Sequence, residues 1–225
     1  SAIAMNQVLQ NPSGAHYDLL TVGINSKKYL ENIGFFGSAY YQTGKNTLAQ
    51  SKNAYQFSAN VDFLIHSKFN VILGTEWLSG RNFDTDSGEN KSFSPMYGTN
   101  HLHNGFMDYF YFGNSHFNSF GLNDYYLKSN LKFSPNSILQ ANLHAFTSNG
   151  KLGFDTSGEK IPSYLGTELD LVFTHKIGKS ITANLGHSFM FSGKSMEYLK
   201  NVPEPKNLQT WSWIAFRIAP NFKIK

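Results

Sequence analysis

Apolar and polar side chains alternate one by one along most of this chain. The clearest run covers residues 55–66, where Tyr, Phe, Ala, Val, Phe and Ile occupy every second position of YQFSANVDFLIH. Successive side chains of an extended strand point to opposite faces, so a period of two indicates β-structure. The alternation therefore predicts long strands with one apolar face and one polar face.

The same pattern recurs through the rest of the chain. Residues 2–9, 15–26 and 31–42 are rich in strand-forming residues but have an ambiguous register. Adding these to the clean runs gives about ten strands, and the only helical turn that we expect lies at 195–200, inside a loop. The other alternating runs are 69–77, 126–133, 139–145, 165–176, 181–192 and 208–218.

The expected connections alternate between short and long. Short turns are predicted near 25–29, 66–68, 134–137 and 177–179, and long loops near 43–53, 81–117, 150–162 and 193–207. One end of the sheet would then carry only tight turns and the other all the long loops, as in outer-membrane barrels. We therefore predict an all-β fold, an antiparallel transmembrane β-barrel forming a single domain over 1–225 in the bacterial outer membrane. A soluble β-sandwich or soluble barrel is the alternative.

Composition agrees with a barrel and excludes several other classes. Aromatic residues make up 16% of the chain and charged residues 15%, with a mean hydropathy of −0.34 and no Cys. Without Cys there is no disulfide framework and no thiolate metal site. No apolar stretch is long enough for a membrane helix, whereas many strands exceed the roughly 9–11 residues that cross a bilayer as tilted strands. The net charge is +4, but the basic residues are not clustered into a patch, so no nucleic-acid partner is expected.

Four stretches carry a resemblance to a known family. Together, over roughly residues 15–222, they resemble the alginate export family of Gram-negative outer-membrane barrels. The resemblance implies a barrel of about 18 strands, of which this chain corresponds to the C-terminal half. It also implies passive passage of a solute such as an anionic polysaccharide. The stretches are AYYQTGK at 39–45, GTEWLSGRN at 74–82, PMYGTNH at 95–101 followed by GFMDYFY at 105–111, and WSWIAFRIAPNF at 211–222.

The polar strand faces predict the wall of a channel. Acidic and basic side chains are mixed on these faces, and Arg81 and Arg217 are the only arginines in the chain, which differs from the basic pore of the best-known family member. We expect a porin-like channel for a polar solute, either an oligosaccharide or an anionic polysaccharide, with no cofactor and no catalysis. The predicted pore-lining residues are Asp62, Glu76, Asp124, Lys128, Lys132, Gln140, Asn142, His144, Glu168, Asp170, Lys176 and Arg217.

The long loop 81–117 is the candidate constriction. Long connections without secondary structure are usually functional or disordered, and the many aromatic residues of this loop argue against disorder. Two interpretations stay open: the loop folds into the lumen and sets the pore size, or it forms an ordered external cap. The residues predicted at the constriction are Arg81, Tyr97, Asn100, His101, His103 and Asp108.

Other kinds of site receive weaker support. His101, His103 and Asp108 offer three metal ligands, but nothing completes the set, so hydrogen-bonding loop residues are favoured and no metal is predicted. The segment 84–89 resembles the start of a calcium loop but lacks its later ligands, which favours a solvated acidic loop.

Two other functions are retained as alternatives to a channel. A structural or adhesive barrel with a closed lumen uses the same strand pattern. A barrel enzyme would use His144, Asp170 and Ser188, which are predicted to face inward, although no local catalytic motif accompanies them.

Overall fold

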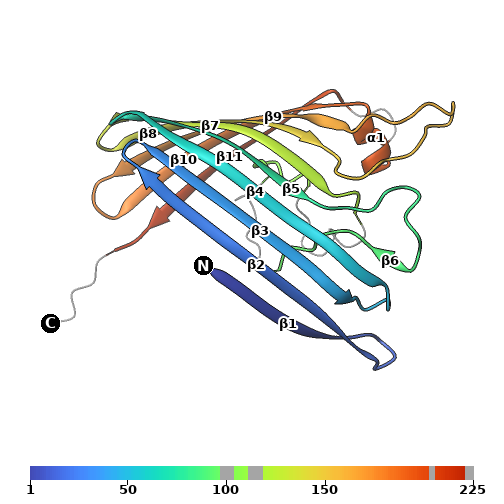
Figure 1. Ribbon diagram of the computed structural model, residues 1–225. Coiled ribbons are helices and arrows are strands. Elements are labelled where there is room, and N and C mark those ends of the chain that lie inside the picture. The colour runs from blue at the N-terminus through green and yellow to red at the C-terminus, as the bar shows by residue number, and fades with distance from the viewer. Residues whose placement is uncertain (97–103, 111–118, 203–205, 221–225) are drawn as a thin grey trace.

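The computed structural model describes residues 1–96, 104–110, 119–202 and 206–220 (Figure 1). Ten long strands follow one another along the chain, and each pairs antiparallel with the next, while the two-residue β6 pairs with β4. The strands are β1 (Ala2–Gln10), β2 (His16–Leu30), β3 (Ile33–Lys45), β4 (Ser51–His66), β5 (Phe69–Leu78), β6 (Glu89–Asn90), β7 (Leu122–Ser134), β8 (Ser137–Thr147), β9 (Tyr164–Ile177), β10 (Ile181–Ser192) and β11 (Leu208–Ile218). The all-β prediction of about ten strands is confirmed.

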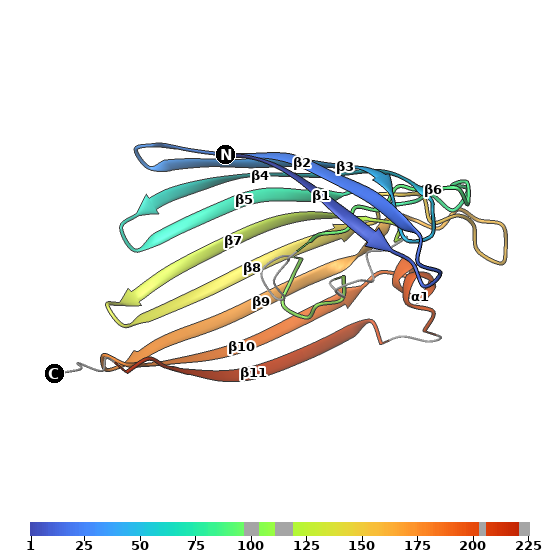
Figure 2. The same ribbon diagram turned by 90° about the horizontal axis from the view of Figure 1, so that it is seen from below.

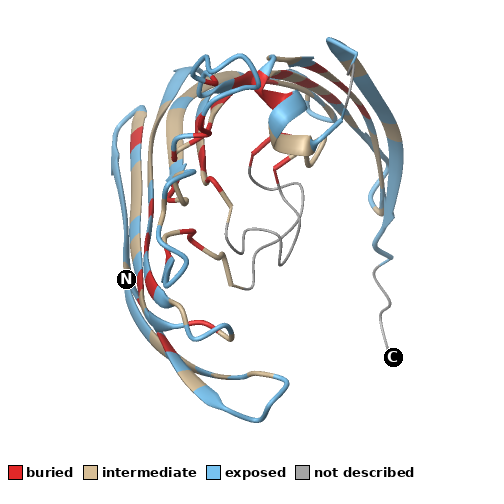
Figure 3. Ribbon diagram, turned by 90° about the vertical axis from the view of Figure 1, so that its right-hand side faces the viewer, coloured by how far each residue is buried: buried red, intermediate tan, exposed pale blue. Residues whose placement is uncertain are grey.

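The sheet curls into a wall that is open on one side. In the view along the strands, β1 and β11 stand at the two free edges, and loop segments lie inside the curve (Figure 3). No pairing joins β1 to β11 among the described residues. The described strands therefore form one antiparallel sheet that is not closed into a barrel.

Short and long connections lie at opposite ends of the sheet (Figure 2). The four short turns cover residues 31–32, 67–68, 135–136 and 178–180, and the C-terminal strand ends on their side. The longest connections cover 79–121, 148–163 and 193–207, and the last contains α1 (Ser195–Lys200) as predicted. Among the described residues, no helix is long and apolar enough to cross a membrane.

Two boundaries differ from the sequence prediction. The turn expected near 25–29 is strand, because Lys27 and Lys28 continue the ladder opposite Phe36 and Phe35. The chain turns instead at Glu31, which has a left-handed φ of 49°. The loop expected at 43–53 shrinks to residues 46–50, since β3 and β4 pair out to Lys45 and Ser51.

The outer face of the sheet is apolar and exposed. The register aligns a row of aliphatic side chains across neighbouring strands, from Val61 through Leu73, Leu127 and Leu143 to Leu169. Leu73 is 58% exposed and Leu127 is 45% exposed. Aromatic side chains flank this row toward both ends of the strands, including Tyr41, Tyr55, Trp77, Phe133 and Phe173. A water-soluble sheet buries such a face, whereas a membrane barrel turns it toward lipid.

The inner face carries polar residues together with a core at the long-loop end. Phe93, Phe110 and Phe120 from the longest loop pack with Leu78 and Phe146 from the sheet. Leu165 was expected on the outer face but is 0% exposed. A register shift in the pairing of β8 with β9 leaves it between Tyr164 and Gly166, and this irregularity turns its side chain into the core.

Large aromatic rings on the inner face lie against glycines of the neighbouring strand. Tyr40 covers Gly23 directly opposite on β2, and Trp213 covers Gly186 directly opposite on β10. A Cβ at either glycine would overlap the ring atoms. These pairs allow the rings to lie flat on the wall, which keeps bulky side chains out of the enclosed space.

Candidate functional site

All twelve predicted pore-lining residues lie on the inner face of the sheet, by the register of their strands. They differ in exposure. Lys132, Lys176 and Arg217 are exposed near the short-turn end. Asp62, Glu76, Lys128 and Gln140 are half-buried, and five others are fully covered: Asp124, Asn142, His144, Glu168 and Asp170. These five side chains are covered by the rest of the described chain.

Three of the half-buried polar groups contact neighbouring side chains, two of them across strands and Lys128 within its own strand β7. The Nδ2 of Asn70 donates to Asp62 at 2.9 Å, and the Nε2 of Gln56 donates to Glu76 at 3.1 Å. The Lys128 ammonium lies 4.6 Å from the centre of the Tyr126 ring. Short pairings of this kind hold the side chains against the wall rather than across the lumen.

The covered groups do not form a catalytic triad. His144 Nδ1 contacts the two carboxylate oxygens of Asp124 at 2.9 and 3.0 Å. The Ser188 hydroxyl donates to Asp170 at 2.5 Å. No hydrogen bond joins Ser188 to His144 in the described part of the chain, so the geometry of a serine nucleophile with its histidine base is missing.

Part of the longest loop lies inside the curved sheet (Figure 3). The backbone N–H of Met107 donates to Glu168 Oε1 at 2.8 Å, which fastens the loop to β9. The Phe110 ring packs on the Phe146 ring of β8 with centroids 4.5 Å apart. Gly105, at φ 82°, lies so close to the Glu168 carboxyl that a Cβ would be 2.5 Å from Oε1. Segment 104–110 is therefore packed on the inner wall.

A second part of the same loop is anchored on β3 and β4. Gln42 exchanges two hydrogen bonds with the backbone of Ser94, at 2.9 and 3.0 Å. Lys52 donates to Asn90 at 3.1 Å, to Ser94 Oγ at 3.2 Å and to the Ser92 carbonyl. Neither anchor was predicted from the sequence. The sequence feature that could have indicated these anchors is position, because Gln42 and Lys52 lie on the polar face near the long-loop end of their strands.

The predicted constriction residues are only partly described. Tyr97, Asn100, His101 and His103 lie outside the described residues. The Arg81 guanidinium stacks 4.1 Å from the Phe120 ring centre. Asp108 belongs to segment 104–110, which we call the inserted segment, and has a left-handed φ of 55°. Of these six, the structure therefore places Asp108 inside the sheet and Arg81 against the loop core.

The described residues contain no candidate metal site built from His, Asp and Glu side chains. No group of three or more His, Asp or Glu side chains is arranged to hold a metal ion there. In the acidic segment 84–89, Asp86 accepts a hydrogen bond from the Gly88 amide at 2.7 Å, and Glu89 pairs with Lys91 at 2.9 Å. These carboxylates close a local turn.

Helix α1 clamps the inserted segment from the loop side. The Lys200 ammonium donates to the Tyr109 carbonyl and lies 5.7 Å from the Phe110 ring centre. The Tyr109 hydroxyl donates to Gln209 of β11. Burial lowers the pKa of Lys200 to about 8, and burial and then the nearby Glu168 raise the pKa of Tyr109.

The low pKa of Lys200 gives a testable pH dependence. Between about pH 8 and the ordinary lysine value of 10.5, the unfolded chain binds more protons, so the free energy of unfolding rises with pH. Over this pH range, Lys200 should raise the free energy of unfolding by about 1–3 kcal/mol in total. Urea unfolding of the wild type and Lys200→Met at pH 7.5 and 9.5 should show a smaller rise in the variant. Equal rises would contradict this assignment.

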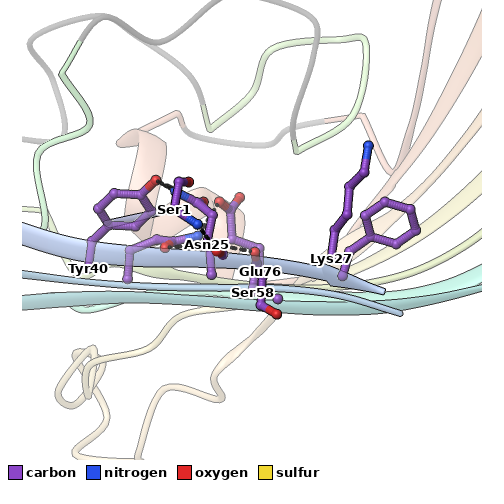
Figure 4. Close-up of a pocket in the computed structure, with 11 residues that line it drawn as sticks. Ser1, Asn25, Lys27, Tyr40, Ser58 and Glu76 are labelled. Atoms are coloured by element: carbon purple, nitrogen blue, oxygen red, sulfur yellow. Dashed lines mark hydrogen bonds between the residues drawn. The ribbon is translucent and has the colours of Figure 1, made fainter. Parts of the chain in front are cut away.

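A hollow of about 660 Å³ lies on the inner face of the N-terminal half (Figure 4). Asn25 and Tyr40 exchange hydrogen bonds at 2.6 and 2.9 Å, and Ser38 contacts Ser58 at 2.7 Å. The wall thus mixes hydroxyl, amide, carboxylate and ammonium groups with aromatic rings. The lining residues are Ser1, Asn25, Ser26, Lys27, Phe36, Gly37, Ser38, Tyr40, Gln56, Ser58 and Glu76.

Comparison with known proteins gives no family. Neither a family model nor a curated protein sequence matches this chain. The resemblance to alginate export proteins therefore stays a prediction that depends on the four quoted stretches.

Proposed function

We propose that this chain is part of an outer-membrane β-barrel channel for a polar solute. The observation that carries the proposal is the inverted distribution of side chains. Leu73, Leu127 and Leu143 are exposed on the outer face, while Glu168, Asp170 and Asn142 are buried on the inner face. Lipid outside and polar groups inside a curved sheet account for both facts at once.

The proposed membrane location also accounts for the open side of the sheet. Lipid-exposed strand edges leave backbone groups without partners, so membrane sheets close. We propose that further strands close the wall between β1 and β11 into a barrel of about 18 strands, as the family resemblance implies. The ten-strand meander would then be its C-terminal part.

The expected solute is an oligosaccharide or another polar molecule without strong net charge. The hollow beside Tyr40 offers donors and acceptors of both charge signs, including Lys27 and Glu76. An anionic polysaccharide is less well matched, because Arg217 is the one arginine on the described inner strand faces. In this proposal, segment 104–110 narrows the passage from the side of β8 and β9.

Planar-bilayer recording tests the channel function. Protein purified in detergent and added to the bilayer should give stepwise openings whose current is proportional to voltage. An added oligosaccharide that enters the lumen should reduce the current. The competing function, a structural or adhesive barrel with a closed lumen, predicts inserted protein without openings. Such silence, with insertion verified by protease protection, would exclude the channel.

A further inference from the structure

Two acidic side chains lie next to each other on the inner face of β9. Glu168 and Asp170 are two positions apart in the strand, so both point to the same face, and each is 0% exposed. Their carboxyl groups are hydrogen-bonded to each other. An ionised carboxylate can only accept hydrogen bonds, so this contact needs a proton on one of the two groups. The pair therefore holds at least one proton.

Three further donors surround the pair. The backbone amides of Phe106 and Met107 donate to Glu168, the second of them to Oε1 at 2.8 Å. The hydroxyl of Ser188, which is opposite Asp170 on β10, donates to Asp170 Oδ1 at 2.5 Å. Donors of this kind stabilise an ionised carboxylate, whereas two ionised carboxylates in contact repel each other. One shared proton and one negative charge satisfy both conditions.

The ionisable groups around the pair have other partners. His144, opposite Glu168 on β8, contacts Asp124 of β7, and the Lys128 ammonium lies over a tyrosine ring of its own strand. On the loop side, Lys200 donates to a backbone carbonyl of the inserted segment. The residues of β10 opposite the pair are uncharged. The titratable groups on the elements packed against the pair are Asp108, Tyr109, Asp124, Lys128, His144 and Lys200.

We propose that the proton shared by Glu168 and Asp170 holds the inserted segment on the wall. Glu168 joins the two, because it accepts from the amides of the inserted segment and also contacts Asp170. Loss of the proton leaves two negative charges in contact inside a covered space. Water relieves this repulsion by hydrating both charges, and it reaches them when the segment that covers Glu168 moves away. Alkaline pH therefore releases the inserted segment.

Infrared spectroscopy of the folded, detergent-solubilised chain tests for the shared proton. At pH 7 the wild type should show the C=O stretch of one neutral carboxyl group, and Asp170→Asn should lose this band. The introduced amide donates to Glu168 in place of the proton, which leaves Glu168 ionised. Glu168→Gln should lose the same band, so the test remains available if one variant fails to fold. Asp62→Asn is the matched control, because Asp62 is an inner-face carboxylate paired with Asn70, and it should keep the band.

Hydrogen–deuterium exchange measures the release of the inserted segment. In the wild type, peptides that contain residues 104–110 should lose protection between pH 6 and pH 9, after correction for the intrinsic exchange rate. Asp170→Asn should keep its protection at both pH values, because it has no second charge to hydrate. Lys200→Met is the second control, since Lys200 contacts the same segment and titrates in this pH range. It should retain the loss of protection seen in the wild type.

Two results would overturn the role of the shared proton. The first is a wild type without the neutral carboxyl band, or a band that persists in the folded variants. The second is an equal loss of protection in Asp170→Asn and the wild type, which would assign the pH response to another group. The inference rests on the proposed function only where release of the segment widens a passage. Neither measurement involves ion conduction, so a protein that is silent in bilayers would count against the channel alone.

Discussion

Replacement of Leu127 by arginine should lower the free energy of unfolding in lipid vesicles by about 2–4 kcal/mol, the cost of arginine near a bilayer midplane. Leu127 is at the middle of β7 and 45% exposed on the outer face, flanked by Leu73 and Leu143 on the adjacent strands. In water, a substitution at such an exposed position changes stability by only about 0.5 kcal/mol. The large effect is therefore specific to a lipid-facing side chain.

Asn130→Arg is the control on the same strand. Asn130 is half-buried on the inner face, opposite Asn70 and Gln140, where arginine can reach the polar lumen. Its effect should stay within about 0.5 kcal/mol. Urea unfolding of both variants, refolded into phosphatidylcholine vesicles, measures the difference. Similar stabilities for the two variants would contradict lipid contact at the outer face.

Gly105→Ala should increase the single-channel conductance. A Cβ at this position would meet the Glu168 carboxyl oxygens at 2.5 and 2.7 Å, and the backbone has a left-handed φ of 82°. The added methyl group therefore pushes segment 104–110 away from β9 and breaks the Met107 hydrogen bond. If this segment narrows the passage, its displacement widens the path for ions.

Gly158→Ala separates this steric effect from backbone strain. Gly158 has nearly the same φ, 83°, but no atom lies within 4 Å of its added Cβ. Both variants should lose about 1–2 kcal/mol through the left-handed backbone, and only Gly105→Ala should change the conductance. Unaltered conductance in Gly105→Ala would show that the inserted segment does not limit the pore.

The sequence was sufficient to predict the wall, because a period of two depends only on local geometry. Residues 55–66 alternate so regularly that β4 and the direction of its two faces follow directly. The inner positions of Asp62, Glu76 and Asp170 followed from the same alternation. Breaks in the period were not predicted, as at Leu165, where an irregular ladder changes the face of the side chain.

The packing of the long loop against the sheet could not be predicted from the alternation of side chains. The contact between Met107 and Glu168 joins residues 61 positions apart, and Lys200 reaches Tyr109 across 91 positions. No local pattern connects these partners, because the contact depends on how the whole sheet curves. The sequence therefore left open whether the loop enters the lumen or caps it, and it did not indicate Asp124 as the partner of His144.

Thiol modification of an inner-face cysteine tests the channel most directly. The chain has no Cys, so an introduced one is the only target. Ser58 lines the inner hollow on β4, and Leu73 is 58% exposed on the outer face of β5. In planar bilayers, a charged, water-soluble methanethiosulfonate should reduce the conductance of Ser58→Cys and leave Leu73→Cys unchanged. A modified Ser58→Cys protein with unchanged conductance, or block of Leu73→Cys alone, would contradict a water-filled lumen on the polar face.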